Sequence, residues 1–244
     1  PLITVCEPRP EHEGLSRAQR SVIKACQGVE LLTSGELRVV DDEGCDVPHD
    51  GATIGEIVVR GNVVMKGYYA DPEATAEALR DGWFHTGDIG MIDEDGYITI
   101  TDRKKNILVT SGGKNVAPQP VENALVTSKW IEQIVVIGDR RKFVSALVVP
   151  AFVNLEDWAK ENNLQFHSRE ELIALPAVKE LYDRVIAESM EGFAQFEKIK
   201  KYVLLPSEFT IESGELTPSL KVKRSVVEKH YADLIESMYQ EAES

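Results

Sequence analysis

Long apolar runs are missing from this sequence of 244 residues. A helix that spans a membrane needs about 20 consecutive, mostly apolar residues, and no stretch comes near that length. The first residues also lack the basic segment and the apolar stretch of a secretory signal. These absences predict a soluble protein without a transmembrane segment.

Cysteine is scarce, with three residues that all lie within the first 45 positions. Their number is odd and no C-x-x-C pair occurs, so we expect free thiols in a reducing compartment and therefore a cytoplasmic location. The five histidines share no metal-ligand spacing with cysteine or carboxylate residues, which argues against a metal site. The residues concerned are Cys6, Cys26 and Cys45, and His12, His49, His85, His167 and His230.

Positive charge is in deficit, because 27 lysine and arginine residues stand against 41 aspartate and glutamate residues. The formal charge of −14 and an isoelectric point near 4.9 disfavour tight binding to nucleic acid or to an anionic membrane. Hydrophobic residues make up 43% of the sequence, which is enough for real cores and excludes a disordered chain.

An initiator methionine is lacking as well, and the chain begins with an extended apolar run, Pro1–Val5. We therefore expect a fragment that starts in the middle of a fold. Its first part is predicted to be rich in β-structure, with neighbouring antiparallel strands and a hairpin around an Asp-Gly turn. The expected strands are 36–41, 54–60 and the hairpin 89–101, and the expected helices are 16–25 and 74–80, the latter begun by Asp71 and Pro72.

The pattern changes near Lys105, after which helical and strand-like segments alternate. We place a domain boundary there, so that a β-rich domain at residues 1–104 precedes an α+β domain at residues 105–244, which is a normal domain size. The expected strands of the second domain are 107–109, 134–137, 144–149 and 202–205, and its expected helices are 121–127, 155–162, 170–173, 178–193 and 222–241.

Two segments of the first part carry polar side chains that suit ligand binding. In Trp83–Asp88 an aromatic pair leads into a Thr-Gly-Asp turn, and the carboxylate of Asp88 can accept hydrogen bonds from vicinal hydroxyls such as those of a ribose. Asp102–Lys105 places three cations after a strand, where they can hold a phosphate or a nucleotide. Taken alone, each segment more often belongs to a solvated surface.

Two further segments lie in the second part. Thr110–Lys114 contains a glycine pair whose backbone can closely approach a phosphate or a narrow thiol-bearing ligand, although a plain turn explains it equally well. Thr217–Arg224 leads into the last expected helix and carries three cations in four positions. A lysine there can neutralise charge that develops during phosphoryl transfer, whereas the plainer interpretation is a basic surface patch.

The succession of these segments resembles that of the adenylate-forming enzymes, and within them most of all the long-chain fatty-acid CoA ligases. The resemblance runs from about Gly35 to Tyr239 and is specific because several spaced motifs agree in order. The motifs are Gly67-Tyr68-Tyr69, Asp71-Pro72-Glu73-Ala74-Thr75, Gly82–Asp88, Asp95-Gly96-Tyr97, Asp102–Lys105 and Ser111–Asn115.

The resemblance implies an activity and an architecture. ATP activates an acid to an acyl-adenylate with release of pyrophosphate, and the thiol of CoA then attacks the acyl group. The fold implied is α+β: a β-rich, barrel-like remnant of the large AMP-binding domain, followed by a small C-terminal domain that moves on a hinge. The implied substrates are a fatty acid, ATP and CoA. A magnesium site is expected outside these residues, and peripheral membrane contact through the acyl substrate stays open.

The resemblance also implies roles for single residues. Asp88 and Arg103 match the residues that hold the ribose hydroxyls of ATP or AMP, and Lys105 matches the hinge. Lys114 matches a basic position that touches phosphate in some members of the family. The loop that lies against the pantetheine of CoA is matched by Ser111, Gly112 and Gly113.

Lys221 matches the mobile lysine that reaches the carboxylate and the α-phosphate during adenylation. The usual pattern is Ser-Gly-Lys, but Leu220 replaces the glycine here, which leaves Lys223 as an alternative. Regulation by acylation of Lys221 is a hypothesis that rests on the family alone.

Two motifs of the family are absent from these 244 residues, namely the Ser/Thr/Gly-rich phosphate loop and the Tyr-Gly-x-Thr-Glu segment. We therefore expect this chain by itself to be unable to adenylate a fatty acid. Two alternatives remain: a medium-chain or aryl acid-CoA ligase of the same superfamily, and a non-catalytic module that binds a nucleotide or CoA.

Overall fold

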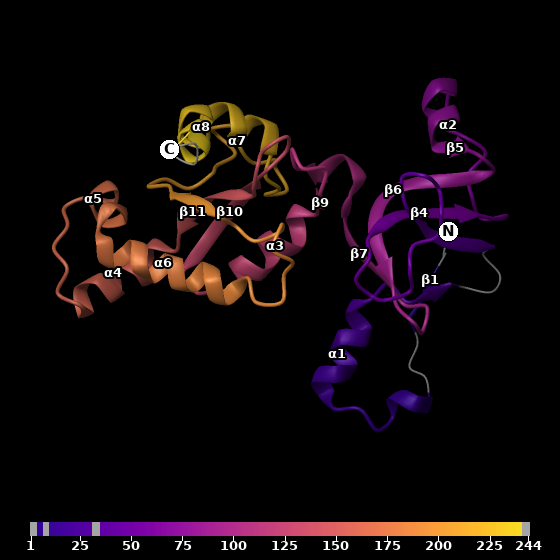
Figure 1. Cartoon of the computed structure of the whole chain (residues 1–244), viewed down its shortest axis with the longest axis horizontal. Coiled ribbons are helices and arrows are strands. Elements are labelled where there is room, and N and C mark those ends of the chain that lie inside the picture. Colours follow the sequence, from indigo (N-terminus) through magenta and orange to yellow (C-terminus); the bar gives the residue numbers. More distant parts are fainter. Residues whose placement is uncertain (1–3, 7–9, 31–34, 241–244) are drawn as a thin grey trace. The chain divides into compact units, whose positions relative to one another are not determined.

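The computed structural model describes residues 4–6, 10–30 and 35–240 (Figure 1). The chain forms two compact units: unit 1 extends to Asn106, and unit 2 begins at Ile107. Within the described ranges, no helix combines the length and the apolar character that crossing a membrane requires. All three cysteines are free, as predicted.

Unit 1 is built on a five-stranded antiparallel sheet. Strand β6 pairs with β4 on one edge and with β5 and β7 on the other, and β3 extends the sheet beyond β4. In the described residues this sheet is open, so the barrel-like part is present without closure. Its strands are β3 (Glu36–Val40), β4 (Gly55–Arg60), β5 (Leu79–Arg80), β6 (Trp83–Ile92) and β7 (Ile98–Arg103), and the separate pair is β1 (Thr4–Val5) with β2 (Val29–Glu30).

The helices of unit 1 begin where the sequence provides caps. Ser16 caps α1 (Arg17–Ala25) in a capping box with Gln19, and Asp71 caps α2 (Pro72–Ala78) through the amide of Ala74. The helix predicted over 74–80 thus ends two residues early, because Leu79 and Arg80 pair with the start of β6 as strand β5. The short 3-10 turns are η1 (Pro10–His12) and η2 (Lys104–Asn106).

Unit 2 contains a three-stranded sheet in the order β10-β11-β12 and a short ribbon of two strands. Strand β11 is buried along its whole length, because helices cover both faces of the sheet: α3, α4 and α6 lie on one side, and α7 and α8 on the other (Figure 1). The strands are β8 (Leu108–Val109), β9 (Asn115–Val116), β10 (Ile131–Ile137), β11 (Ser145–Pro150) and β12 (Lys201–Leu204).

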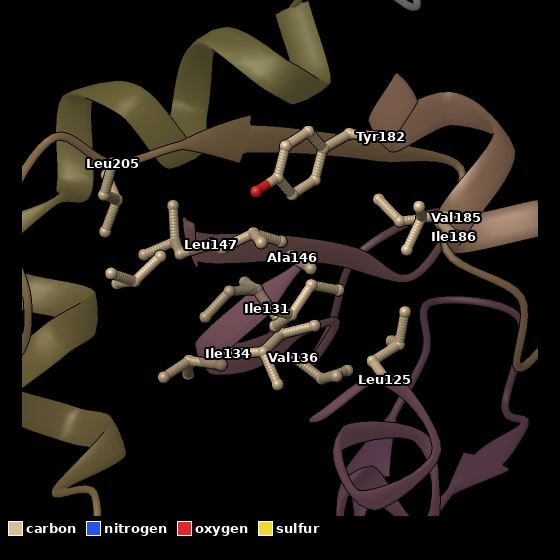
Figure 2. Close-up of a cluster of buried hydrophobic side chains, with 14 of the residues drawn as sticks. Leu125, Ile131, Ile134, Val136, Ala146, Leu147, Tyr182, Val185, Ile186 and Leu205 are labelled. Atoms are coloured by element: carbon tan, nitrogen blue, oxygen red, sulfur yellow. The ribbon is translucent and has the colours of Figure 1, made fainter. Parts of the chain in front are cut away.

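The core of unit 2 joins this sheet to the helices around it. Figure 2 shows side chains from α3, β10, β11 and α6 gathered in one apolar cluster, to which Leu205 adds from the segment after β12. The hydroxyl of Tyr182, a buried side chain, donates to the carbonyl of Trp130 over 2.6 Å, so its polar atom is satisfied inside the core. The helices are α3 (Pro118–Val126), α4 (Phe152–Glu161), α5 (Arg169–Ala174), α6 (Pro176–Ser189), α7 (Arg224–His230) and α8 (Ala232–Gln240).

The single closing helix predicted over 222–241 is wrong in the described part. The chain forms two helices, α7 and α8, with Tyr231 between them at φ −108°. Tyr231 packs edge-on against Phe209, with ring centroids 6.0 Å apart, so the break is fixed by tertiary packing. Residue 241 lies outside the described residues.

A buried carboxylate, Glu56, lies within the sheet of unit 1 and is only 6% exposed. Its Oε2 is 3.0 Å from His85 Nδ1, 3.0 Å from Lys104 Nζ and 3.6 Å from Arg80. Burial by itself raises the pKa of Glu56, but the hydrogen bonds from His85 and Lys104 outweigh it, so the pKa lies below its ordinary value. The ionised form is therefore the one that the fold stabilises.

We expect Glu56→Gln to lower the free energy of unfolding of unit 1 at pH 7 by about 1–3 kcal/mol, because charged hydrogen bonds are lost. A carboxylate with a lowered folded pKa stabilises fully above its unfolded pKa of about 4.3, and that stability is lost as the pH falls through the folded pKa. The wild type should therefore weaken below about pH 4 more steeply than the variant. Urea unfolding, followed by hydrogen exchange in β4, measures both the loss of stability at pH 7 and its dependence on pH.

Glu36→Gln is the matched control, since Glu36 pairs with Arg60 on the same sheet but is 60% exposed. Its effect should stay below about 1 kcal/mol. Equal acid slopes for wild type and Glu56→Gln would show that Glu56 does not titrate as described.

Candidate functional site

Asp88 and Arg103, which the sequence predicted to act together, lie side by side. They are register partners on the paired strands β6 and β7, and Arg103 Nε is 2.8 Å from Asp88 Oδ1. The Asp88 side chain is 25% exposed and that of Arg103 is 60% exposed, so solvent reaches both. Together they present carboxylate acceptors and guanidinium donors, the groups that complement a vicinal diol.

The Thr-Gly-Asp segment is an irregular part of strand β6, so the turn predicted for it is wrong. The pairing with β4 shifts register here: Glu56 faces Ile89, whereas Val58 faces His85. Gly87 has φ +70°, a conformation that favours glycine. Thr86 holds the irregularity, because its hydroxyl donates to the carbonyl of Ile57 at 2.7 Å and accepts from the amide of Asp88 at 3.0 Å.

The three cations of Asp102–Lys105 point to different environments. Arg103 pairs with Asp88, Lys104 with the buried Glu56, and Lys105 is exposed on the turn η2. Asp102 is itself buried, and its Oδ1 accepts from the Arg103 amide and from the side chain of Asn106. These contacts fix the backbone just before Lys105 to the sheet of unit 1.

The glycine loop, Thr110–Lys114, joins strands β8 and β9 of unit 2. The buried Thr110 closes it: its amide donates to the Lys114 carbonyl at 3.0 Å, and its hydroxyl accepts from the Lys114 amide at 3.1 Å. Ser111, Gly112 and Gly113 are exposed at its tip. A Cβ added at either glycine would meet no atom within 4 Å, so another molecule can approach the backbone closely there.

Lys114 lies at the end of this loop and is exposed, with its Nζ 5.7 Å from the centroid of the Phe196 ring. Phe196 itself is 42% exposed. The open backbone and the ammonium group of the loop therefore lie near one exposed aromatic ring, that of Phe196.

Lys221 is the last residue of a tight hairpin, Thr217–Lys221, that lies shortly before α7. The Leu220 amide donates to the Thr217 carbonyl, the Thr217 amide to the Lys221 carbonyl, and the Lys221 amide to the Thr217 hydroxyl. Leu220 is 68% exposed and has φ +60°. A turn followed by a left-handed residue usually takes glycine at that place, so the substitution noted in the sequence stands at a strained position.

The base of the lysine hairpin is tied to a second buried carboxylate, Glu215. Its carbonyl accepts from the Lys223 amide at 2.7 Å, and its side chain accepts from Ser213 at 2.6 Å and lies 3.1 Å from His230 Nδ1. Burial raises the pKa of Glu215, but the bonds from Ser213 and His230 outweigh it and the net pKa is lowered. Lys223 is thus fixed through its backbone, whereas Lys221 belongs to the hairpin.

Arg224, the third cation of this segment, faces inward, so the predicted surface patch of three cations is wrong for this residue. Its side chain is 25% exposed and lies 2.7 Å from Glu122 of α3, and it also donates to the carbonyl of Val136. The amide of Val136 donates to the same carboxylate oxygen of Glu122. Arg224 therefore anchors the start of α7 to α3 and β10.

The predicted site residues fall into two groups. Asp88, Arg103 and Lys105 belong to unit 1, whereas the glycine loop and Lys221 belong to unit 2. Sequence reasoning missed Glu56 and Glu215, although a glutamate among Ile and Val in the first case is itself a signal of a buried charge. In the described residues, no group of three or more His, Cys, Asp and Glu side chains could hold a metal ion.

Leu220→Gly should raise the free energy of unfolding of unit 2 by up to about 1 kcal/mol, because glycine adopts φ +60° without steric strain. The exposed leucine gives up little buried surface in return. Leu234→Gly, inside helix α8 and 41% exposed, is the control and should cost about 1 kcal/mol. Urea unfolding distinguishes the two, and a loss as large at position 220 as at 234 would contradict the strain.

Comparison with known proteins places the chain in a family. The family model of the AMP-binding enzyme C-terminal domain matches residues 105–243. A long-chain-fatty-acid–CoA ligase of Mycobacterium tuberculosis is 41% identical over 209 residues, which cover 85% of this chain and 33% of that protein. Long-chain-fatty-acid–CoA ligase 5 of Mus musculus is 41% identical over 193 residues, covering 78% and 28%. The chain thus spans about a third of the length of the curated relatives that it matches.

Solved structures agree in fold. The adenylation domain of a carboxylate reductase from Mycobacterium chelonae has a TM-score of 0.67 and 28% identity, over 87% of this chain and 32% of that one. A didomain of carboxylic acid reductase from Segniliparus rugosus, solved in complex with AMP, has a TM-score of 0.65 and 28% identity, over 88% and 29%. The predicted resemblance and the α+β fold class are both confirmed, and the chain belongs to the family of AMP-binding, adenylate-forming enzymes.

Proposed function

We propose that this chain works in an ATP-dependent acid–CoA ligase whose acid is a long-chain fatty acid. The observation that carries the proposal is the contact between Asp88 and Arg103, in a chain 41% identical to a ligase of that name. A carboxylate that accepts and a guanidinium that donates, on adjacent strands and open to solvent, suit the two hydroxyls of the ribose of ATP or AMP.

The proposed reaction has two steps. An oxygen of the acid's carboxylate attacks the α-phosphorus of ATP, and pyrophosphate leaves with the electron pair of the broken P–O bond. The sulfur of CoA, having lost its proton, then attacks the acyl carbon, and AMP leaves. Lys221 is assigned to the first step, because an ammonium group beside the carboxylate and the α-phosphate offsets the charge between them.

The glycine loop and Lys105 are assigned to the second step. The exposed backbone of Gly112 and Gly113 leaves room for the narrow pantetheine arm of CoA, and Lys114 stands beside it for a phosphate. Lys105 serves as the hinge, since the residue before it is held by Glu56 while its own side chain is exposed. Magnesium, which ATP chemistry requires, is expected to be held by residues other than those described, and a cytoplasmic location stays a prediction.

The test is acid-dependent turnover by the protein as it is made in the cell. It is incubated with ATP, CoA and one of palmitate, octanoate or benzoate, and AMP, pyrophosphate and acyl-CoA are quantified by mass spectrometry. We expect equal amounts of AMP and acyl-CoA, with the highest kcat/KM for palmitate. A preference for octanoate or benzoate would favour the medium-chain or aryl alternative, and AMP binding without acid-dependent pyrophosphate release would favour the non-catalytic module.

Lys221→Ala should lower the rate of adenylation by about a hundredfold or more, because a charge-stabilising donor is lost from the transition state. Thioester formation from preformed acyl-AMP should change little. Lys223→Ala is the matched control, since it removes the same charge two residues away. Equal losses in both half-reactions would contradict the assignment of Lys221. A larger adenylation defect in Lys223→Ala than in Lys221→Ala would assign the role to Lys223 instead.

A further inference from the structure

The glycine loop has little packing of its own. Strands β8 and β9 pair over two residues each, and a ribbon that short is marginally stable by itself. Ser111, Gly112, Gly113 and Lys114 are exposed. The position of the loop therefore depends on contacts at its two ends. These are the buried Leu108 and Val116 in the core of unit 2, and the hydrogen bonds that β8 and Ser111 make.

Those hydrogen bonds lead to one turn, Gly138–Arg141, between β10 and β11. The amide of Ser111 donates to the carbonyl of Arg141 at 2.8 Å, and the amide of Arg140 donates to the carbonyl of Val109 at 2.7 Å. The amide of Val109 donates in turn to Asp139 Oδ1 at 3.1 Å. Three hydrogen bonds thus fix the base of the loop to this turn.

Helix α8 holds the Gly138–Arg141 turn in place through the side chain of Arg141. Both terminal nitrogens of its guanidinium reach the two oxygens of Glu236, in a bidentate pair. The same guanidinium lies 4.9 Å from the centroid of the Tyr239 ring, one helical turn further on. Tyr239 is itself held, because its hydroxyl is 2.8 Å from that of the buried Ser145 and donates to the Phe143 carbonyl at 3.1 Å.

We propose that Arg141 is a positioning residue for the glycine loop, so that helix α8 sets the place of the backbone that receives CoA. An isolated surface ion pair contributes little, but a bidentate pair that also stacks on a fixed aromatic ring has the geometry that does. The effect on CoA rests on the proposed function, whereas the effect on the loop does not. The two are therefore measured separately.

Hydrogen exchange over residues 108–116 tests the positioning, in the protein as it is made in the cell. Arg141→Met keeps the aliphatic part of the side chain and removes the guanidinium group. We expect the hydrogen-exchange rate of this segment to rise at least about tenfold. Glu236→Gln should act alike, and the double variant should add little, because both remove one interaction. The exchange rate in Arg141→Lys should lie between those of the wild type and Arg141→Met, since an ammonium group keeps the charge but cannot form the bidentate pair.

Arg140→Met is the matched control. The side chain of Arg140, next to Arg141 in the sequence, is 92% exposed and approaches Asp139 only to 3.7 Å. Hydrogen exchange over residues 108–116 in this variant should therefore match that of the wild type. Equal exchange in Arg141→Met and Arg140→Met would overturn the proposal. A uniform rise over unit 2, β12 included, would overturn it as well, because the pair would then support the whole fold rather than the loop.

Kinetics test the consequence for CoA. In Arg141→Met we expect KM for CoA to rise about tenfold while pyrophosphate release stays near that of the wild type, since a displaced loop weakens CoA binding alone. If the wild type forms no acyl-CoA, the proposed function fails while the exchange result still decides the positioning. If the wild type is active and KM for CoA is unchanged in the variant, the positioning role for CoA is refuted.

Discussion

Ion pairs between arginine and glutamate hold the exposed loops of unit 2 to its helices. Arg141 joins the turn beneath the glycine loop to Glu236 on α8, and Arg224 joins the start of α7, which follows the lysine hairpin, to Glu122 on α3. Exposed loops bury little apolar surface, so the free energy that keeps them in one place must come from polar contacts. A guanidinium fork suits this task because it fixes direction as well as distance.

Two buried glutamates, Glu56 and Glu215, also hold nearby segments of the chain in place. Glu56 loses water when it is buried, and the bonds that it receives from His85 and Lys104 offset that penalty. The ion pair with Glu56 holds Lys104 to the sheet of unit 1, directly before the exposed Lys105. Glu215 follows the same logic at the base of the lysine hairpin, with Ser213 and His230 as its partners.

The sequence predicted best what depends on neighbouring residues. The cap at Asp71, the hairpin around Asp95 and the buried strand β11 were all visible in local pattern and propensity. Predictions failed where strand pairing or tertiary packing overrides the local preference for a helix. Leu79 and Arg80 leave their helix because they pair with Phe84 and Trp83 at the start of β6. The last helix breaks where Tyr231 packs against Phe209.

The same distinction applies to the site. The motifs named Asp88 and Arg103, but their contact depends on a register shift between β6 and its neighbours that no local pattern encodes. Arg224 was indistinguishable in sequence from the two lysines before it, because only the fold supplies Glu122 as its partner. Residue type is local information, whereas the direction in which a side chain points is set by elements far away in the chain.

Leu220 shows how a strained residue can still serve a loop. Its φ of +60° is costly for leucine, yet the turn is held by three hydrogen bonds that join Thr217 to Leu220 and Lys221. Pro218 holds it as well, because its ring fixes one backbone angle. Glycine at this place would relieve the strain, but it would also widen the range of backbone conformations open to the hairpin whenever those bonds loosen. A leucine therefore exchanges some stability for a narrower range of positions of Lys221, and the role proposed for Lys221 in adenylation would require that precision.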